Sequence, residues 1–331
     1  MHISRLHLAA DSGEIELPKG GITWLNAPGD GECGVALPQL QATQCFFPAY
    51  AALEARGISV APKLDHIPQN VLITSHRSKA FTLDLIAEAV ERVRPGGLVA
   101  IDGDKTNGIE SIAKELKRHF ESVHSYSKAH GKLIWIMRPI DIPDLSAWRD
   151  ITYLFPNGWT TRAGVFSADG PDAGSKALAE ALPPLKGRIA DLGAGWGYLM
   201  AEVLKSDGVT ELVGIEADHH AVTCAQHNIR DPRAKILWDD ALAVTEVGFD
   251  IVVTNPPFHT SRKPDPALGI AFIEKAATML APKGQLWMVA NRNLPYEAAL
   301  EAHFRKSNII AQGGGFKVIH ASHPKTARMG R

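Results

Sequence analysis

The sequence predicts an α/β protein with two tandem Rossmann-like domains, of which the second carries a mostly parallel sheet of seven strands. Strand-like and helix-like segments alternate through the second half of the chain, which favours a doubly wound parallel sheet. The first half repeats part of that pattern. The length of 331 residues also suits two domains better than one.

The elements of the second half follow from short apolar runs separated by segments with helical spacing. We expect strands at residues 185–190, 212–216, 234–238, 249–254 and 285–290, and helices at 198–205, 219–229 and 267–280. The last two runs, 309–311 and 316–321, flank three successive glycines. They predict a closing antiparallel pair.

The first half looks like a degenerate copy of the second. Residues 70–75 resemble 250–255, and residues 85–101 resemble 272–289. Where the second copy has Asn-Pro-Pro-Phe, the first has Ser-His-Arg-Ser, and no GxGxG turn precedes it. We therefore predict a degenerate domain at 1–150, without a cofactor site, and a second domain at 151–331. The prolines of residues 139–160 mark the boundary between them.

The composition excludes several classes of protein. The formal net charge is −1, so any RNA site must be a local patch. The three cysteines, Cys33, Cys45 and Cys224, form no CxxC pair, which argues against a disulfide framework or a zinc site and favours a reducing, cytoplasmic location. The N-terminus lacks the apolar core of a signal peptide, and no apolar run is long enough to span a membrane.

A glycine-rich turn after a predicted strand marks the candidate cofactor site. Asp191 is followed by Gly193, Gly195 and Gly197, and then by a predicted helix. Glycines let the backbone approach a ligand closely, and the first turn of a helix offers free N–H groups. The pattern therefore predicts a cradle for a nucleotide-like ligand.

Acids at the ends of the next two strands strengthen this prediction. Glu216 could accept hydrogen bonds from both ribose hydroxyls, and Asp240, with Ala241 beside it, could accept one from an adenine amine. NAD is the rival ligand, but the spacing is GxGxG rather than the GxGxxG of dinucleotide sites. The loop downstream also has no role in hydride transfer, so we favour S-adenosylmethionine (SAM).

The candidate catalytic loop is Asn255-Pro256-Pro257-Phe258. The lone pair of an exocyclic base amine is delocalised into the ring, so methylation needs acceptors that hold the two N–H bonds. Asn255 supplies a side-chain carbonyl and Pro256 a backbone carbonyl, and the two prolines stiffen the loop. Phe258 could stack on the face of the base. His259, next in the chain, is a weaker candidate for substrate contact.

These motifs resemble those of a known family, the bacterial small-subunit ribosomal RNA guanine-N2 methyltransferases of the RsmC type. The matching segments are Ala163–Ser167, Asp169–Gly170, Asp172–Ser175, Asp191–Gly195, Thr254–His259, Val289–Tyr296 and Phe316–Val318. The resemblance implies two class I methyltransferase domains, of which only the second binds SAM. It also implies that Phe166 lies over the SAM pocket, and that Asn291 and Tyr296 lie near the guanine.

We therefore predict transfer of a methyl group from SAM to N2 of a guanine in 16S rRNA of the small ribosomal subunit, by a monomer that needs no metal. Two alternatives stay open. The acceptor could be a large-subunit rRNA guanine, an adenine N6 or a protein glutamine, since such loops serve all these amines. The protein could instead be a non-catalytic RNA-binding or assembly factor.

RNA affinity should come from local basic groups that contact phosphates. The candidates are Arg262 and Lys263 beside the catalytic loop, the tail from Lys325 to Arg331, and the segment His76–Lys79 of the first domain.

Overall fold

The computed structural model describes residues 2–36, 39–149, 151–257 and 266–325 of the 331-residue chain. The chain divides into two compact units. The first comprises residues 1–153 together with Arg162–Gly164, and the second comprises residues 154–161 and 165–331. The division falls a few residues after the expected boundary at 150, and a short segment from the linker returns to the first unit.

The first unit contains a sheet of seven strands among its described residues, with helices on both faces. Its main strands are β2 (Ile22–Leu25), β4 (Leu40–Thr43), β5 (Ser59–Ala61), β6 (Asn70–Thr74), β7 (Leu98–Asp104), β8 (His124–Lys128) and β9 (Gly131–Met137). Its α-helices are α1 (Arg5–Asp11), α2 (Phe47–Ala55), α3 (Lys79–Arg92), α4 (Ile109–His119) and α5 (Ser146–Arg149). The short strands β1 (His2–Ile3) and β3 (Gly31–Glu32) pair with each other.

The second unit repeats this architecture. Its strands are β12 (Lys186–Leu192), β13 (Gly208–Glu216), β14 (Ala234–Trp238), β15 (Phe249–Thr254), β16 (Leu280–Asn291), β17 (Phe304–Gly313) and β18 (Phe316–Pro324). Its helices are α6 (Ala173–Ala181), α7 (Tyr198–Leu204), α8 (His219–Asn228), α9 (Pro266–Met279) and α10 (Glu297–His303). The strands β10 (Thr152–Leu154) and β11 (Thr160–Arg162) form a further two-stranded sheet.

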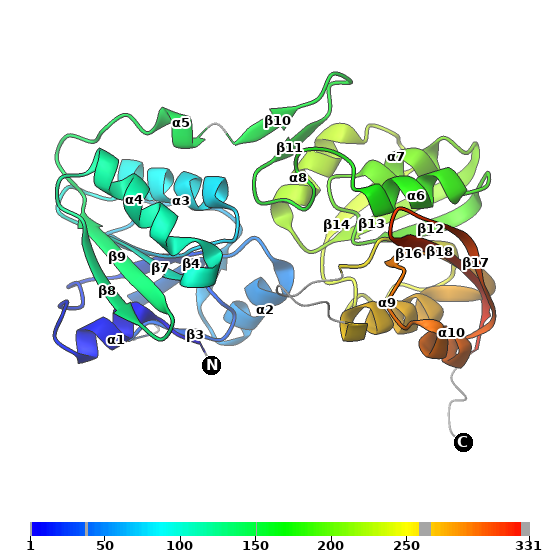
Figure 1. Ribbon diagram of the computed structural model, residues 1–331, viewed down its shortest axis with the longest axis horizontal. Coiled ribbons are helices and arrows are strands. Elements are labelled where there is room, and N and C mark those ends of the chain that lie inside the picture. Colours follow the sequence, from blue (N-terminus) through cyan, green and yellow to red (C-terminus); the bar gives the residue numbers. More distant parts are fainter. Residues whose placement is uncertain (1, 37–38, 150, 258–265, 326–331) are drawn as a thin grey trace. The chain divides into compact units, whose positions relative to one another are not determined.

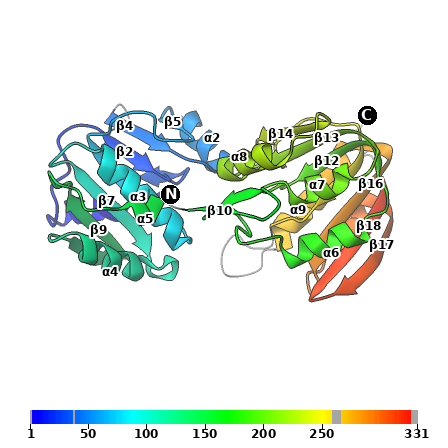
Figure 2. The same cartoon turned by 90° about the horizontal axis from the view of Figure 1, so that it is seen from above.

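The two large sheets have the same strand order. The second sheet runs β14-β13-β12-β15-β16-β18-β17, and the first runs β5-β4-β2-β6-β7-β9-β8. In the second sheet β12 to β16 are parallel, and β18 pairs antiparallel with both β16 and β17. Figure 2 shows this antiparallel pair at one edge of the second sheet. The predicted fold class, including the closing antiparallel pair, is therefore confirmed.

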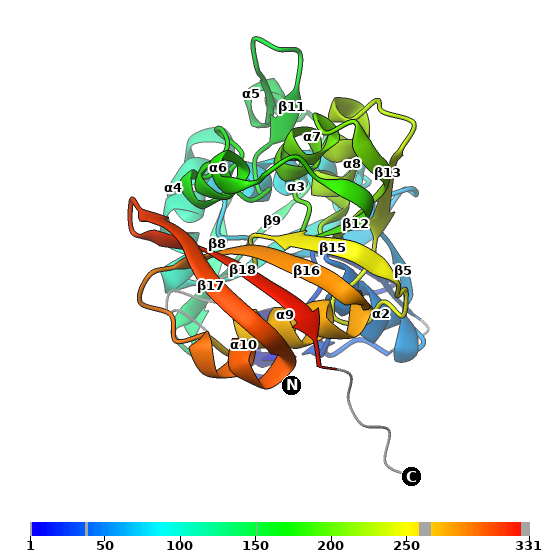
Figure 3. The same ribbon diagram turned by 90° about the vertical axis from the view of Figure 1, so that its right-hand side faces the viewer.

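Helices cover both faces of the second sheet. In Figures 1 and 3, α6, α7 and α8 lie on one face and α9 and α10 on the other. One apolar core joins Leu178, Met200 and Val203 to Ile189 and Val253 of the sheet. A second core packs α9 and α10 against the opposite face. Alternate strand residues point to opposite faces, so both sides of the central strands are buried.

Most predicted elements of the second half lie within one or two residues of the observed ones. The strands at 234–238 and 249–254 coincide with β14 and β15. Strand β16 begins five residues before the expected 285, because the segment at 280–284 is extended and irregularly paired with β15 rather than a separate turn. Among the described residues, no helix is long and apolar enough to cross a membrane.

Candidate active site

The candidate site lies at the carboxyl ends of β12 and β15. The chain winds outward from β12 through β13 and β14 on one side, and through β15 and β16 on the other. The crevice where the winding direction changes is the usual ligand site of an open α/β sheet. The glycine turn follows β12 and Asn255 follows β15, so the topology brings the two predicted motifs to one place.

The glycine turn is open to an approaching ligand. Gly193 and Gly195 have φ values of +77° and +55°, a left-handed backbone that side chains rarely adopt. A Cβ placed on Gly195 would meet no atom within 4 Å, and one on Gly193 only a Phe272 carbon at 3.9 Å. Gly197, with φ +96°, precedes helix α7 directly. Bare backbone with free space above it suits close contact with a ligand.

Glu216 holds the glycine turn from the neighbouring strand. Its carboxylate accepts hydrogen bonds from the backbone N–H of Gly195 at 2.8 Å and of Asp218 at 2.7 Å. Burial raises the pKa of Glu216, while these N–H donors act in the opposite direction. Each carboxylate oxygen has a further lone pair, so the side chain can orient the turn and still accept from a ligand.

Asp191 is fully buried beneath the turn. Among the described residues, neither of its carboxyl oxygens has a hydrogen-bond partner. Burial, and secondly the nearby charge of Glu216, raise the pKa of Asp191 to about 8. A buried carboxyl group without a partner is costly, and such groups cluster at functional sites.

Asp240 begins a short turn after β14. Its carboxylate accepts from the backbone N–H of Leu242 at 2.9 Å, and its backbone carbonyl accepts from Ala243. Ala241 beside it is buried. Asp240 stands at the end of the third strand, as the sequence predicts, and its ligand role stays a prediction.

Asn255 is held by two residues at the start of helix α6. Its amide nitrogen donates to Asp172 Oδ2 at 3.0 Å and to Ser175 Oγ at 2.8 Å. Its carbonyl oxygen, Oδ1, is buried and has no partner among the described residues. Pro256 is buried and Pro257 is exposed. Phe258, His259, Arg262 and Lys263 lie outside the described residues.

A pocket joins these motifs, with about 390 Å³ of empty space that includes open solvent. The described residues that line it are Phe166, Ser167, Pro171, Asp172, Ser175, Gly193, Ala194, Gly195, Trp196, Tyr198, Leu199 and Asn255. Of the predicted site residues, Phe166, Gly193, Gly195 and Asn255 therefore meet at one cavity. Asp191, Gly197, Glu216, Asp240, Ala241, Pro256 and Pro257 are not among its lining residues.

Phe166 presents an exposed aromatic ring at this pocket, with 56% of its surface accessible. Ser167, which follows it, has φ +52° and accepts a hydrogen bond on its carbonyl from the Trp196 indole at 3.3 Å. Large apolar side chains at the surface often mark binding sites. Asn291, by contrast, is exposed at the end of β16, and Tyr296 is buried in the core beside α9 and α10.

The structure also explains Trp196, the bulky residue inside the glycine turn. Its ring is buried and packs against Phe155 and Trp159, each with ring centroids 5.9 Å away. The Asn228 amide donates to the carbonyls of Trp196 and Thr160, both at 2.9 Å. These contacts anchor the turn, and the sequence offered no local signal for Asn228.

The candidate RNA-binding residues of the first unit differ in whether a charged side chain is exposed and, within the described part of the chain, free of an ion pair. Burial, and secondly the charge of Arg77, lower the pKa of His76 to about 4, so this side chain is uncharged at neutral pH. Arg77 is exposed. Lys79 pairs with Glu115 at 3.1 Å. Arg77 is thus the better cation of this segment for a phosphate.

Comparisons with known proteins agree with the geometry of this site. The family model described as the methyltransferase small domain matches residues 158–320. A ribosomal RNA small subunit methyltransferase C from Shewanella loihica is 30% identical over 257 residues, covering 75% of each chain. The protein of the same name from Hahella chejuensis is 32% identical over 257 residues, covering 72% of each chain.

One solved structure extends the likeness across both units. It is a T. thermophilus 16S rRNA guanine-N2 methyltransferase (RsmC) in complex with AdoMet and guanosine. The TM-score is 0.80 at 25% sequence identity, covering 96% of this chain and 91% of the other. With a glycine turn and an Asn-Pro-Pro loop meeting at one pocket, and relatives matched over most of their length, the chain belongs to the ribosomal RNA small subunit methyltransferase C family of SAM-dependent methyltransferases.

Proposed function

We propose that the protein transfers the methyl group of SAM to the exocyclic N2 amine of a guanine in 16S rRNA of the small ribosomal subunit. The observation that carries the proposal is the carbonyl oxygen of Asn255, which is buried at the pocket without a protein partner among the described residues. A buried acceptor of this kind needs a donor. The N2 amine of guanine offers two N–H donors.

The residues at the pocket fit SAM as the cofactor. The open backbone at Gly193 and Gly195 leaves room for the ligand, and the carboxylate of Glu216 adjoins the turn. We assign the ribose hydroxyls to Glu216, the adenine edge to Asp240 and Ala241, and the close backbone approach to Gly193, Gly195 and Gly197. We also assign Asp191, the buried acid before the turn, to the cofactor site, and Phe166 to the pocket entrance. When bound, SAM supplies an electrophilic methyl group on a sulfonium sulfur.

The protein's own contribution to the reaction is positioning and hydrogen bonding. Asn255 Oδ1 accepts one N–H of the guanine amine, and the Pro256 carbonyl accepts the other. Two acceptors favour a tetrahedral nitrogen, which frees the lone pair for attack. Phe258 stacks on the base face. The new N–C bond forms as the S–C bond breaks, and one amine proton then leaves to water.

This chemistry defines the partners that we propose. The sulfonium is already activated, so the reaction needs no metal ion. We propose that the protein acts as a monomer. A ribosomal substrate places the protein in the cytoplasm, and the basic groups beside the catalytic loop and on the first unit would contact RNA phosphates.

Methyl transfer to defined substrates tests the proposal. Purified protein and labelled SAM would be mixed with small subunits from a strain lacking the gene, with large subunits and with naked 16S rRNA. We expect label in the small-subunit RNA, and digestion with mass spectrometry should identify N2-methylguanosine. Label only in large subunits, in adenine or in protein would overturn the substrate, and absence of SAM binding by calorimetry would favour a non-catalytic RNA-binding factor.

A further inference from the structure

The orientation of the Asn255 amide is determined by its surroundings. Both hydrogens of its NH₂ group have acceptors, Asp172 Oδ2 at 3.0 Å and Ser175 Oγ at 2.8 Å. The oxygen and nitrogen of a carboxamide have similar shapes, so their assignment rests on the neighbouring groups. An ionised carboxylate can only accept. The nitrogen must therefore face Asp172, and the oxygen must face away from it.

One carboxylate oxygen ties the start of a helix to the catalytic loop. Asp172 Oδ2 also accepts from the backbone N–H of Gly174 at 2.9 Å and of Ser175 at 3.1 Å, which caps the N-terminus of α6. A Cβ on Gly174 would lie 2.9 Å from this oxygen and 3.1 Å from the Phe316 ring. The spacing Asp172-x-Gly174-Ser175 thus places two acceptors against Asn255.

We propose that Asp172 and Ser175 are positioning residues that make Asn255 a pure hydrogen-bond acceptor towards the substrate. The inference rests on the proposed function and deepens it, because it assigns the choice of amine substrate to two residues outside the loop. With both N–H bonds engaged, Asn255 cannot donate to a base that presents an acceptor there. The pocket then favours guanine, with its 2-amino donors, over hypoxanthine, which lacks them.

Substitutions at Asp172 separate this role from helix capping. Asp172→Ser keeps a hydroxyl that can cap α6, but its shorter side chain does not extend to the Asn255 amide. Asp172→Asn keeps an oxygen that can accept all three hydrogen bonds. Ser175→Ala removes the second acceptor alone. The matched control is Ser4→Ala, which removes the capping hydroxyl of α1 in the first unit.

Three measurements would be made on each full-length variant. They are kcat and KM for methyl transfer to small subunits, SAM affinity by calorimetry, and the binding of guanosine and inosine to the SAM-loaded protein. We expect Asp172→Ser to lower kcat roughly tenfold or more, the size of a lost charge-assisted hydrogen bond, while SAM affinity is kept. We also expect it to reduce the preference for guanosine over inosine. Asp172→Asn should recover most of both, and Ser175→Ala should show an intermediate loss.

The outcomes distinguish this inference from the proposed function. Full kcat and an unaltered guanosine preference in a folded Asp172→Ser variant would overturn the positioning role. A loss of guanosine preference in Ser4→Ala would also overturn it, because any lost helix cap would then suffice. If the unsubstituted protein does not methylate small subunits, the proposed function fails. A guanosine preference that depends on Asp172 would still support the positioning role, and an unsubstituted protein that binds the two nucleosides equally would refute it.

Discussion

The two units share one sheet topology but differ where the second has its pocket. Matching Lys132 to Lys317, and following the strand pairings from these lysines across each sheet, sets the correspondence between them. Trp24 pairs with Ala42 and Leu72 in the first sheet as Asp191 pairs with Gly214 and Val253 in the second. At the antiparallel edge, Lys132 pairs with Gly103 as Lys317 pairs with Ala290. Every aligned position discussed below follows from these pairings once the two lysines are matched.

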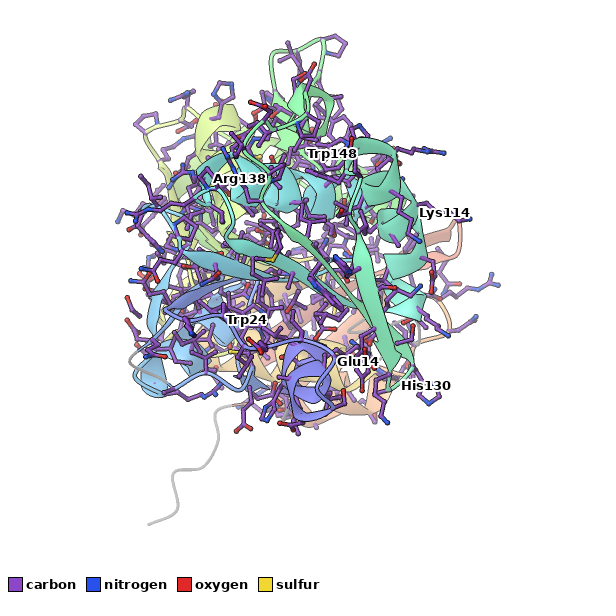
Figure 4. All side chains as sticks on the ribbon, turned by 90° about the vertical axis from the view of Figure 1, so that its left-hand side faces the viewer. Glu14, Trp24, Lys114, His130, Arg138 and Trp148 are labelled. Carbon is purple, nitrogen blue, oxygen red and sulfur yellow. The ribbon has the colours of Figure 1, made fainter. Side chains whose placement is uncertain are left out.

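In the first unit a tryptophan replaces the buried acid. Trp24 is fully buried, and its indole donates to Thr74 Oγ1 at 2.9 Å. By register, Thr74 takes the place of Asn255. The sequence match had aligned Ser75 with Asn255, and the strand pairing moves the correspondence by one residue. Trp24 lies among the packed side chains of its unit in Figure 4. The ring occupies the place of the acid, and its indole N–H donates to the residue at the position of Asn255, whose amide we propose to act in catalysis.

Gln44, which follows β4 in the first unit, makes a hydrogen bond like that of Glu216 but carries no charge. Gln44 stands where the second unit has Glu216, and its side-chain oxygen accepts from the backbone N–H two residues later at 2.8 Å, as Glu216 does at 2.7 Å. Its amide nitrogen donates to the Ala27 carbonyl at 2.7 Å, whereas Glu216 accepts from Gly195. The amide satisfies the local backbone but lacks the carboxylate that we assign to the ribose.

The helix after the first strand is also missing. The described residues 26–36, which follow β2, form no α-helix and include Pro28, Gly29 and Gly31. The second unit has α7 in this position. The comparison teaches that the shared sheet needs none of the pocket chemistry. The first unit fills the space with an apolar ring. The second keeps a buried acid that has no hydrogen-bond partner in the described part of the chain, and proteins retain such local costs at functional sites.

Removing the Trp24 ring should have the largest effect of the substitutions that this comparison suggests. Trp24→Ala should destabilise the first unit by about 3–5 kcal/mol, because a fully buried ring leaves a cavity. Hydrogen exchange of the β2 and β6 amides would measure the loss. We expect the number of SAM molecules bound per chain to stay at one, because the new cavity has neither a glycine turn nor the Glu216 carboxylate. A second bound SAM, or a loss below about 1 kcal/mol, would break the comparison.

Replacing Asn255 by threonine, the residue that the first unit has at this position, tests whether the amide is needed for methyl transfer. Asn255→Thr should lower kcat by roughly 100-fold or more, the scale seen when an oriented hydrogen-bonding group is removed from an active site. SAM affinity should be nearly kept, because Asn255 is assigned to the base. Single-turnover methyl transfer and calorimetry would measure the two quantities. Unaltered turnover would refute the assignment of Asn255 as the amine acceptor.

Replacing Glu216 by glutamine, the corresponding residue of the first unit, should have a smaller effect. Glu216→Gln makes the second unit match Gln44, and we expect SAM affinity to fall about tenfold because charge-assisted bonds to the ribose become neutral ones. The matched control is Glu211→Gln on the same strand, whose carboxylate pairs with Arg188 and Lys235 instead. Equal SAM affinities in the two variants would contradict the ribose role of Glu216.

The local parts of this site could be predicted from the sequence, and the distant ones could not. The glycine turn and Asn-Pro-Pro are contiguous motifs after strands, so their placement follows from the chain itself. Asp172 and Ser175 lie about 80 residues before Asn255 in the chain, and only the folded structure, in which the start of α6 meets the residue after β15, reveals their contact. Trp24 carries no motif at all. Its correspondence to Asp191 depends on strand pairing. Pairing is hard to infer from sequence similarity alone, which had aligned Ser75 instead of Thr74 with Asn255.

The buried acid itself should make stability depend on pH. The folded pKa of Asp191 is raised from 3.8 to about 8, so between these values the folded state holds a proton that the unfolded state has released. Stability of the ligand-free second unit should therefore fall as pH rises through this window, by up to about 1.4 kcal/mol per pH unit for one proton. Asp191→Asn should flatten the dependence. Denaturant unfolding from pH 5 to 8 would measure it, and an equally steep fall in the variant would show that the difference between Trp24 and Asp191 has no energetic consequence.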